Sequence, residues 1–112
     1  MISKDELDNI ILAAKAGGTV ISGLFEDDLD IKQKDSVADV VTQADVGSEK
    51  EILSHLYKSF PTYNIHSEED GKSDNGSERT FVIDPLDGTN NFVLGIPNFT
   101  VSIALFDGNG II

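Results

Sequence analysis

The first third of the chain places apolar and small residues at helical spacing. They recur every three or four positions and share one face of a helix: Leu7, Ile10, Ile11, Ala14, Gly18, Ile21, Leu24 and Phe25. Ser3 and Glu6 are spaced as a capping box, in which each side chain accepts a hydrogen bond from the other residue's backbone N–H. The pattern therefore predicts a long amphipathic helix. Gly17 and Gly18 within it would let another backbone approach closely.

The pattern then predicts paired strands and a second helix. Positions 31–41 alternate polar and β-branched residues, which is typical of a hairpin. The second helix is expected to begin at a cap supplied by Thr42 or Asp45 and to end before Pro61. Its mostly apolar stripe contains Val46, Glu49, Leu53, Leu56, Tyr57 and Phe60.

Three further strands are expected in the second half of the chain. Residues 63–66 form a short candidate strand, and residues 81–83 read as a buried one. Between them, residues 70–77 have loop composition, and we expect a mobile segment that can act as a lid. Residues 99–105 alternate with period two, and a turn at residues 107–110 follows. One face of this strand would carry Phe99, Val101, Ile103 and Leu105.

The length of 112 residues predicts a single domain spanning positions 1–112. Only Ile111 and Ile112 remain after the last turn, where a return strand is expected. We therefore expect this polypeptide to be part of something larger or to have lost its remainder. An unfinished sheet would leave an unpaired edge, and such an edge could recruit a complementary fragment or a second copy of the chain.

Composition narrows the classes of partner. The chain has 20 acidic and 8 basic residues, and its formal net charge of −12 opposes binding to nucleic acid and favours cations. It has no cysteine, which excludes disulfides and thiolate metal sites. The charged N-terminus is unlike a secretory signal, and no segment approaches membrane-spanning length. The expected location is the cytoplasm, with no membrane partner.

The most informative motif runs from Ile83 to Phe92, with the sequence IDPLDGTNNF. It places Asp84 and Asp87 three residues apart at the end of an apolar strand. Two carboxylates held close together repel unless a cation lies between them, and oxygen ligands suit Mg²⁺. Free backbone N–H groups after Asp87, where a helix could begin, favour a phosphate. The alternative interpretation of the motif is an Asp-rich surface turn.

These residues resemble the signature of the inositol monophosphatase family of Mg²⁺-dependent, lithium-sensitive phosphatases. Further blocks agree in order: Lys34, the segment DVVTQAD at residues 39–45, the pair Glu68-Glu69 and the segment GIPNFTVSI at residues 95–103. The likeness covers essentially the whole chain but only the N-terminal half of a family member. A second family signature, a Trp-Asp block that supplies a further metal ligand, is absent. The resemblance implies the N-terminal part of a layered α+β sugar-phosphatase-like sandwich, with two helices packed on an antiparallel sheet.

The resemblance also implies a metal-ligand set. It makes Glu68, Asp84, Asp87 and the backbone carbonyl of Leu86 ligands of Mg²⁺, with Asp84 bridging two sites. Such a pair of ions could activate an attacking water and neutralise charge on the phosphoryl group.

Catalytic and substrate-binding roles follow from the same resemblance. Glu68 would lie beside the attacking water, and Thr89, hydrogen-bonded to Asp45, would help to orient and deprotonate it. The amides of Gly88 and Thr89 would hold the phosphate. The residues expected to contact substrate are Glu68, Leu86, Asp87, Gly88 and Thr89. Glu69 and Lys34 would support the site, Lys34 near a mobile loop and a weaker third metal.

Most of these residues have an ordinary structural alternative. Asp45 could cap the second helix, and residues 68–70 alone would read as a solvated acidic loop, an interpretation that only the downstream aspartates reverse. Lys34 alone is a surface lysine. Neither His55 nor His66 has a partner at ligand spacing, so we expect structural or solvent-facing roles for them.

Two departures from the family pattern remove no ligand. Ser67 stands where many relatives carry glycine before the glutamate pair, and Leu94 stands where some carry histidine or lysine.

The function that the sequence predicts is Mg²⁺-dependent hydrolysis of a phosphomonoester, inositol monophosphate or a similar small polyol phosphate, through attack by water. Sibling specificities, a 3'(2'),5'-bisphosphate nucleotidase or a fructose-1,6-bisphosphatase, remain open. The alternative from another class is a truncated, non-catalytic fragment that binds metal or phosphate. A homodimer or a complementing C-terminal fragment also remains open as a partner. A calcium buffer is less favoured, because the chain has no EF-hand loop.

Overall fold

The computed structural model describes residues 1–26, 37–68 and 72–112, with backbone alone at residue 26 and residues 37–42. Lys34, Glu69 and positions 31–36 of the predicted hairpin lie outside the described residues, as does the start of the predicted lid. No helix in the described part of the chain is long and apolar enough to cross a membrane.

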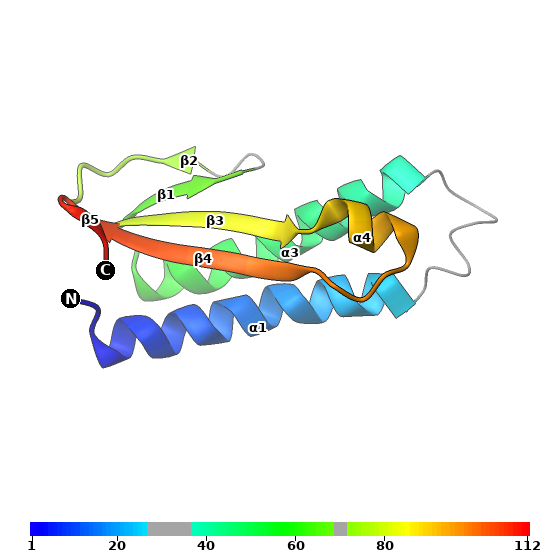
Figure 1. Ribbon diagram of the computed structural model, residues 1–112. Helices are drawn as coiled ribbons and strands as arrows, with labels where there is room; N and C mark the ends of the chain where they lie inside the picture. Colours follow the sequence, from blue (N-terminus) through cyan, green and yellow to red (C-terminus); the bar gives the residue numbers. More distant parts are fainter. Residues whose placement is uncertain (27–36, 69–71) are drawn as a thin grey trace.

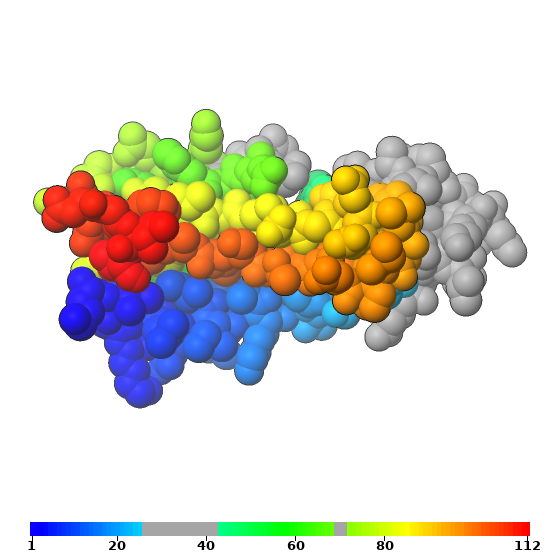
Figure 2. All heavy atoms as spheres, viewed as in Figure 1, coloured from blue at the N-terminus to red at the C-terminus, as the bar shows by residue number. Residues whose placement is uncertain are grey.

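Two long helices pack against one face of a five-stranded sheet (Figure 1). Both termini lie at the same end of the molecule, and the short helix lies at the other end. Figure 2 shows the first helix, in blue, lying along the fourth strand, in orange. In chain order the elements are α1 (Lys4–Glu26), α3 (Val37–Ser59), β1 (Asn64–Ser67), β2 (Lys72–Ser73), β3 (Thr80–Asp87), α4 (Thr89–Leu94), β4 (Thr100–Asp107) and β5 (Gly110–Ile111).

The sheet is mixed, with strand order β2-β1-β3-β4-β5. The expectation of an antiparallel sheet is therefore wrong for one pair, because β1 and β3 run parallel. The chain leaves β1, returns along its outer edge as the two-residue strand β2, and then crosses to the other side of β1. Because β2 runs antiparallel to β1 and the chain turns again after β2, β3 runs in the same direction as β1. The strands predicted at residues 63–66, 81–83 and 99–105 are present as β1, β3 and β4, and the turn before β5 is closed by a 2.7 Å hydrogen bond from Asn109 N–H to Asp107.

The capping box at the start of α1 is confirmed. Glu6 N–H donates to Ser3 Oγ at 3.0 Å, and Ser3 N–H donates to Glu6 Oε1 at 2.9 Å. The Glu6 carboxylate is buried, and it also accepts a 2.7 Å hydrogen bond from the Tyr63 hydroxyl. Arg79 Nη1 lies 3.7 Å from the same carboxylate. The cap therefore joins the helix start to the segments that lead into β1 and β3.

The predicted apolar face of α1 is only partly correct. Leu7 and Ile11 are 45% and 42% exposed, whereas Ala13 and Gly17 are buried. A Cβ atom on Gly17 would lie 2.7 Å from Ser48 Oγ, and one on Gly47 would lie 2.8 Å from Val20 Cγ1. The closest approach of α1 and α3 thus takes place over small residues. Ile21 of the predicted face is buried in a second apolar cluster, whereas Leu7, Ile11 and Leu12 of α1 face solvent.

Helix α3 begins at Val37, which corrects two expectations. Residues 37–41 are helical rather than extended, and Thr42 and Asp45 lie inside the helix rather than at its N-cap. The predicted end is confirmed, because α3 stops at Ser59 two residues before Pro61. Its buried face matches the predicted stripe only in part. Glu49, Leu56 and, directly after the helix, Phe60 are buried as predicted, whereas Val46 and Tyr57 are exposed. The other buried positions of α3 are Ala44, Ser48 and Ile52.

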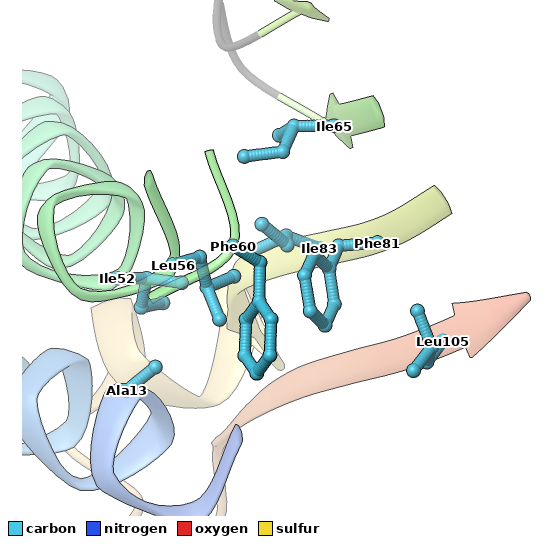
Figure 3. Close-up of a cluster of buried hydrophobic side chains, with 8 residues drawn as sticks. All are labelled: Ala13, Ile52, Leu56, Phe60, Ile65, Phe81, Ile83 and Leu105. Atoms are coloured by element: carbon cyan, nitrogen blue, oxygen red, sulfur yellow. The ribbon is translucent and has the colours of Figure 1, made fainter. Parts of the chain in front are cut away.

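The main core lies between the helices and the sheet (Figure 3). Figure 3 shows aromatic and aliphatic side chains from α1, the α3 end and three strands meeting in one layer: Ala13, Ile52, Leu56, Phe60, Ile65, Phe81, Ile83 and Leu105. Val82, between two buried residues of β3, is 40% exposed, so β3 is buried on one face only. One face of the sheet is therefore packed against helices, and the other face is open within the described chain.

Replacing Gly17 should weaken the helix contact. We expect Gly17→Ala to lower the free energy of unfolding by about 1–3 kcal/mol, because the new methyl group would overlap Ser48 and Ile52. Gly18→Ala is the matched control, since nothing lies within 4 Å of a Cβ there. Its helix propensity should instead raise stability by about 0.5–1 kcal/mol. Urea denaturation of both variants measures the difference, and equal effects would contradict the proposed contact.

The cap at Glu6 should make stability depend on pH. Burial alone would raise the pKa of Glu6, but hydrogen bonds from Ser3 and Tyr63 and the charge of Arg79 outweigh it and lower the pKa below its usual 4.5. A carboxyl group whose pKa is lowered on folding stabilises the protein above pH 4.5, and the contribution is lost as the pH falls through the folded-state pKa. The stability difference between wild type and Glu6→Gln should therefore shrink on acidification below pH 4.5.

Urea denaturation at a series of pH values checks this dependence. Tyr63→Phe removes one hydrogen-bond donor to the Glu6 carboxylate. In this variant, the loss of stability on acidification should therefore be smaller than in wild type. If the stability difference between wild type and Glu6→Gln stays constant with pH, the cap does not act through the charge of Glu6.

Candidate functional site

The parallel pairing of β1 and β3 brings two predicted ligands side by side. Ser67 is the partner of Ile83 in this register, so the next positions on the two strands are Glu68 and Asp84. A 2.9 Å hydrogen bond from Glu68 N–H to the Ile83 carbonyl extends the pairing by one step. Because neighbouring strands lie about 4.8 Å apart, this register places the two backbones close together.

Glu68 and Asp84 line one hollow of about 420 Å³. Its walls include residues 82–84 of β3 and alternate residues of β4, and it lies on the side of the sheet where Val82 is exposed, with Ser102 directly across from Asp84. His66, for which no ligand role is predicted, also lines it. The full lining is His66, Ser67, Glu68, Val82, Ile83, Asp84, Ser102, Ala104 and Phe106.

Strand β3 loses its regular pairing immediately after Asp84. Regular register with β4 ends at Asp84 opposite Ser102, and pairing resumes at Asp87 opposite Thr100. Pro85 has no N–H for the ladder, which accounts for the break. The Asp84 carboxylate accepts a 3.2 Å hydrogen bond from the N–H of Leu86. The break therefore fixes how Asp84 is oriented and where the Leu86 backbone lies.

Gly88 turns the chain from β3 into α4. Its φ of 93° is one that other residues rarely adopt, and a Cβ there would lie 3.0 Å from the carbonyl oxygen of Asn98. The Thr89 hydroxyl donates to the Leu86 carbonyl across 3.5 Å, at the outer limit for a hydrogen bond. Phe92 anchors α4 against Phe25 and Phe99, with ring centroids 5.8 and 5.3 Å away. The turn predicted from the Asp-Gly-Thr sequence and the helix after it are both present.

The other predicted site residues lie near this region or outside the described chain. Asp87 is exposed at the end of β3 and does not line the hollow. Asp45 lies on α3, which contacts α4, the helix that carries Thr89. Lys34 and Glu69 lie outside the described residues. Among residues 1–26, 37–68 and 72–112, no group of three His, Cys, Asp or Glu side chains gathers closely enough to hold a metal ion.

The donors at the hollow nevertheless suit Mg²⁺. Magnesium in proteins is commonly held by one or two carboxylates, and its other ligands are waters and substrate oxygens. Glu68 and Asp84 supply two carboxylates at one place, and the Leu86 carbonyl lies two residues beyond Asp84. The predicted set of four ligands stays a prediction, with these two carboxylates as its centre.

Sequence reasoning missed a role for three buried polar residues, of which Ser67 borders the hollow and Ser48 and Glu49 lie on α3 behind it. Ser48 Oγ donates to the Pro85 carbonyl at 2.8 Å, and Ser67 Oγ donates to Glu49 Oε2 at 2.6 Å. The sequence offered one signal for Ser48. It is the only polar residue in a series spaced four residues apart along the helix: Ala44, Ser48, Ile52 and Leu56. A buried hydroxyl in such a series needs a hydrogen-bond partner.

Comparison with known proteins gives concordant matches. The model of the inositol monophosphatase family matches residues 3–112. Nus factor SuhB of Pasteurella multocida is 45% identical over 102 residues, which cover 88% of this chain and 38% of that protein. The fructose-1,6-bisphosphatase/inositol-1-monophosphatase of Aquifex aeolicus is 37% identical over 109 residues, 94% of this chain and 40% of that protein.

The solved structures agree with the sequence matches. The crystal structure of the extragenic suppressor protein SuhB from Bartonella henselae superposes with a TM-score of 0.80 at 34% identity, covering 95% of this chain and 40% of that one. The chain thus spans about two fifths of the length of the relatives it matches. The predicted resemblance is confirmed: this chain belongs to the inositol monophosphatase family.

Proposed function

We propose that the protein is a Mg²⁺-dependent phosphomonoester hydrolase, and that this chain carries the metal-binding and phosphate-binding part of its site. The preferred substrate is inositol monophosphate or a similar small polyol phosphate. The observation that carries the proposal is the placement of Glu68 and Asp84 in the lining of one hollow, with Asp84 four residues before the Gly88 turn, in a chain that the family model matches almost throughout.

The proposed ligands of the metal are Glu68, Asp84, Asp87 and the Leu86 carbonyl. Bound Mg²⁺ supplies positive charge that neutralises the phosphoryl oxygens and makes a nearby water easier to deprotonate. The carboxylate of Asp84 is already oriented by the Leu86 N–H. Glu68 approaches from the neighbouring strand, so that the two side chains face one space without any large movement of the backbone.

The protein groups around the phosphate would orient the water and accept its proton. We assign Glu68 and Thr89 to hold the attacking water, with Asp45 drawing the proton through the Thr89 hydroxyl after that hydroxyl rotates away from the Leu86 carbonyl. The water oxygen forms a new bond to phosphorus and the ester P–O bond breaks, while the leaving alkoxide takes a proton from a solvent water and departs as the alcohol. The amides of Gly88 and Thr89 are assigned to the phosphate oxygens. In this scheme Lys34 and Glu69 have supporting roles only.

The choice of alcohol is the finer part of the proposal. The Aquifex aeolicus relative is named for both fructose 1,6-bisphosphate and inositol 1-phosphate, so the family likeness alone does not separate these substrates. The Asn-Phe pair that follows Asp-Gly-Thr favours the inositol branch. Phosphate release from inositol 1-phosphate, fructose 1,6-bisphosphate and adenosine 3',5'-bisphosphate should be compared directly, with inositol 1-phosphate expected to be hydrolysed fastest.

Removing the charge of Asp84 should abolish metal uptake. We expect Asp84→Asn to weaken Mg²⁺ binding at least ~100-fold and to reduce any phosphatase activity to background, because a neutral amide is a poor ligand for a hard divalent cation. Calorimetric titration with Mg²⁺ and a phosphate-release assay measure the two effects. Asp8→Asn is the matched control, since Asp8 is exposed on α1 and its carboxylate pairs with Lys4 of the same helix.

Three results are distinguishable in this experiment. Turnover that depends on Asp84 supports the hydrolase. Mg²⁺ binding that depends on Asp84 without turnover would support the alternative of a metal-binding, non-catalytic module. Equal Mg²⁺ uptake by wild type and Asp84→Asn would overturn the proposed site.

A further inference from the structure

Helix α3 is hydrogen-bonded to both strands of the candidate site through two consecutive residues. Ser48 donates to the Pro85 carbonyl on β3 at 2.8 Å, and Glu49 accepts from the Ser67 hydroxyl on β1 at 2.6 Å. Ser48 is 0% exposed and Glu49 is 9% exposed. These are buried, long-range contacts between elements separated by 37 and 18 positions in the chain.

Both bonds end immediately beside a predicted metal ligand. Pro85 lies between Asp84 and Leu86, and Ser67 directly precedes Glu68. The Pro85 carbonyl belongs to the segment where regular pairing with β4 is interrupted. A buried carbonyl there needs a partner from elsewhere, and the Ser48 hydroxyl supplies it.

The two α3 residues stand behind the sheet rather than in the hollow. Neither Ser48 nor Glu49 lines the hollow, which opens on the face of the sheet away from α3. They are therefore placed to hold the backbone that carries the ligands and not to contact a metal or a phosphate themselves.

We propose that Ser48 and the Ser67–Glu49 pair are positioning residues that fix the ends of β1 and β3 to one turn of α3, and thereby set the separation of Glu68 from Asp84. This inference rests on the proposed role of those two carboxylates as Mg²⁺ ligands. Because adjacent residues of one rigid helix hold both strand ends, the two ends cannot shift independently. A bond of 2.6 Å between a hydroxyl and a carboxylate is in the range of charge-assisted hydrogen bonds, which are the stronger kind.

The close helix contact is part of the same arrangement. A Cβ on Gly17 would lie 2.7 Å from Ser48 Oγ, so the absence of a side chain on α1 leaves room for the hydroxyl that bonds Pro85. Ser48 is thus held between a glycine on one side and a carbonyl on the other.

Backbone hydrogen exchange tests the positioning directly. In Ser67→Ala, the Glu68 amide should exchange about tenfold faster, and in Ser48→Ala the Leu86 amide should do so, because each variant removes one buried hydrogen bond beside that residue. Amides of Phe81 and Leu105, in the core, serve as internal references within each variant. Ser54→Ala and Glu51→Gln are matched controls, since both residues are exposed on α3.

Mg²⁺ affinity, measured by calorimetric titration of the same proteins, supplies the second readout. Ser48→Ala and Ser67→Ala should each weaken binding about tenfold, while the two controls should match wild type. Glu49→Gln keeps an oxygen that can accept from Ser67, so its affinity should stay closer to wild type than that of Ser67→Ala. This conservative variant also keeps the test available if one of the alanine variants folds poorly.

The outcomes separate the positioning role from the proposed function. Uniform acceleration of all amides with unchanged Mg²⁺ affinity would show a contribution to global stability alone and would overturn the inference. Wild-type protein that takes up no Mg²⁺ would overturn the proposed function, and with it the role of these residues toward metal ligands. In that case local acceleration at Glu68 and Leu86 would still establish that α3 fixes the two strand ends.

Discussion

The parallel pairing of β1 with β3 is the constraint on which the candidate site depends. In this register Glu68 follows Ser67 and Asp84 follows Ile83, so two carboxylates that are distant in the chain leave the sheet side by side. An antiparallel pairing would have placed the end of β1 beside the start of β3, and Glu68 would lie far from Asp84. The two-residue strand β2 makes the parallel arrangement accessible, because it reverses the chain once before β3 begins.

A second constraint is the interruption of β3 at Pro85. Continuous pairing with β4 would hold Asp84, Leu86 and Asp87 in one flat ladder, but proline provides no N–H and the register shifts between Asp84 and Asp87. The interruption leaves a carbonyl without a strand partner, and Ser48 of α3 satisfies it. Gly17 of α1 leaves room for that hydroxyl, so the packing of the two helices is compatible with the contact between α3 and β3.

The sequence predicted the features that depend on local chemistry. The capping box of Ser3 and Glu6, the end of α3 before Pro61 and the turn at Gly88 each follow from a few neighbouring residues. It did not predict the direction of β1 relative to β3 or the helical residues 37–41, because strand order and helix extension are decided by long-range packing. The buried face of α1 was misjudged for the same reason. Apolar residues such as Leu7 and Ile11 surround much of the helix, and the small residues that allow close approach decide which face is buried.

The residues behind the sheet explain how a site rich in negative charge can be ordered before any cation binds. Two carboxylates on neighbouring strands repel each other, and this repulsion favours separation of the strand ends. Hydrogen bonds from Ser48 to Pro85 and from Ser67 to Glu49 oppose that separation from the covered face, where burial strengthens them. A divalent cation in the hollow would then find the two proposed ligands, Glu68 and Asp84, already in place. The ordering cost that otherwise opposes binding would already have been met by folding, since the same helix contact that builds the core also restrains the ligands.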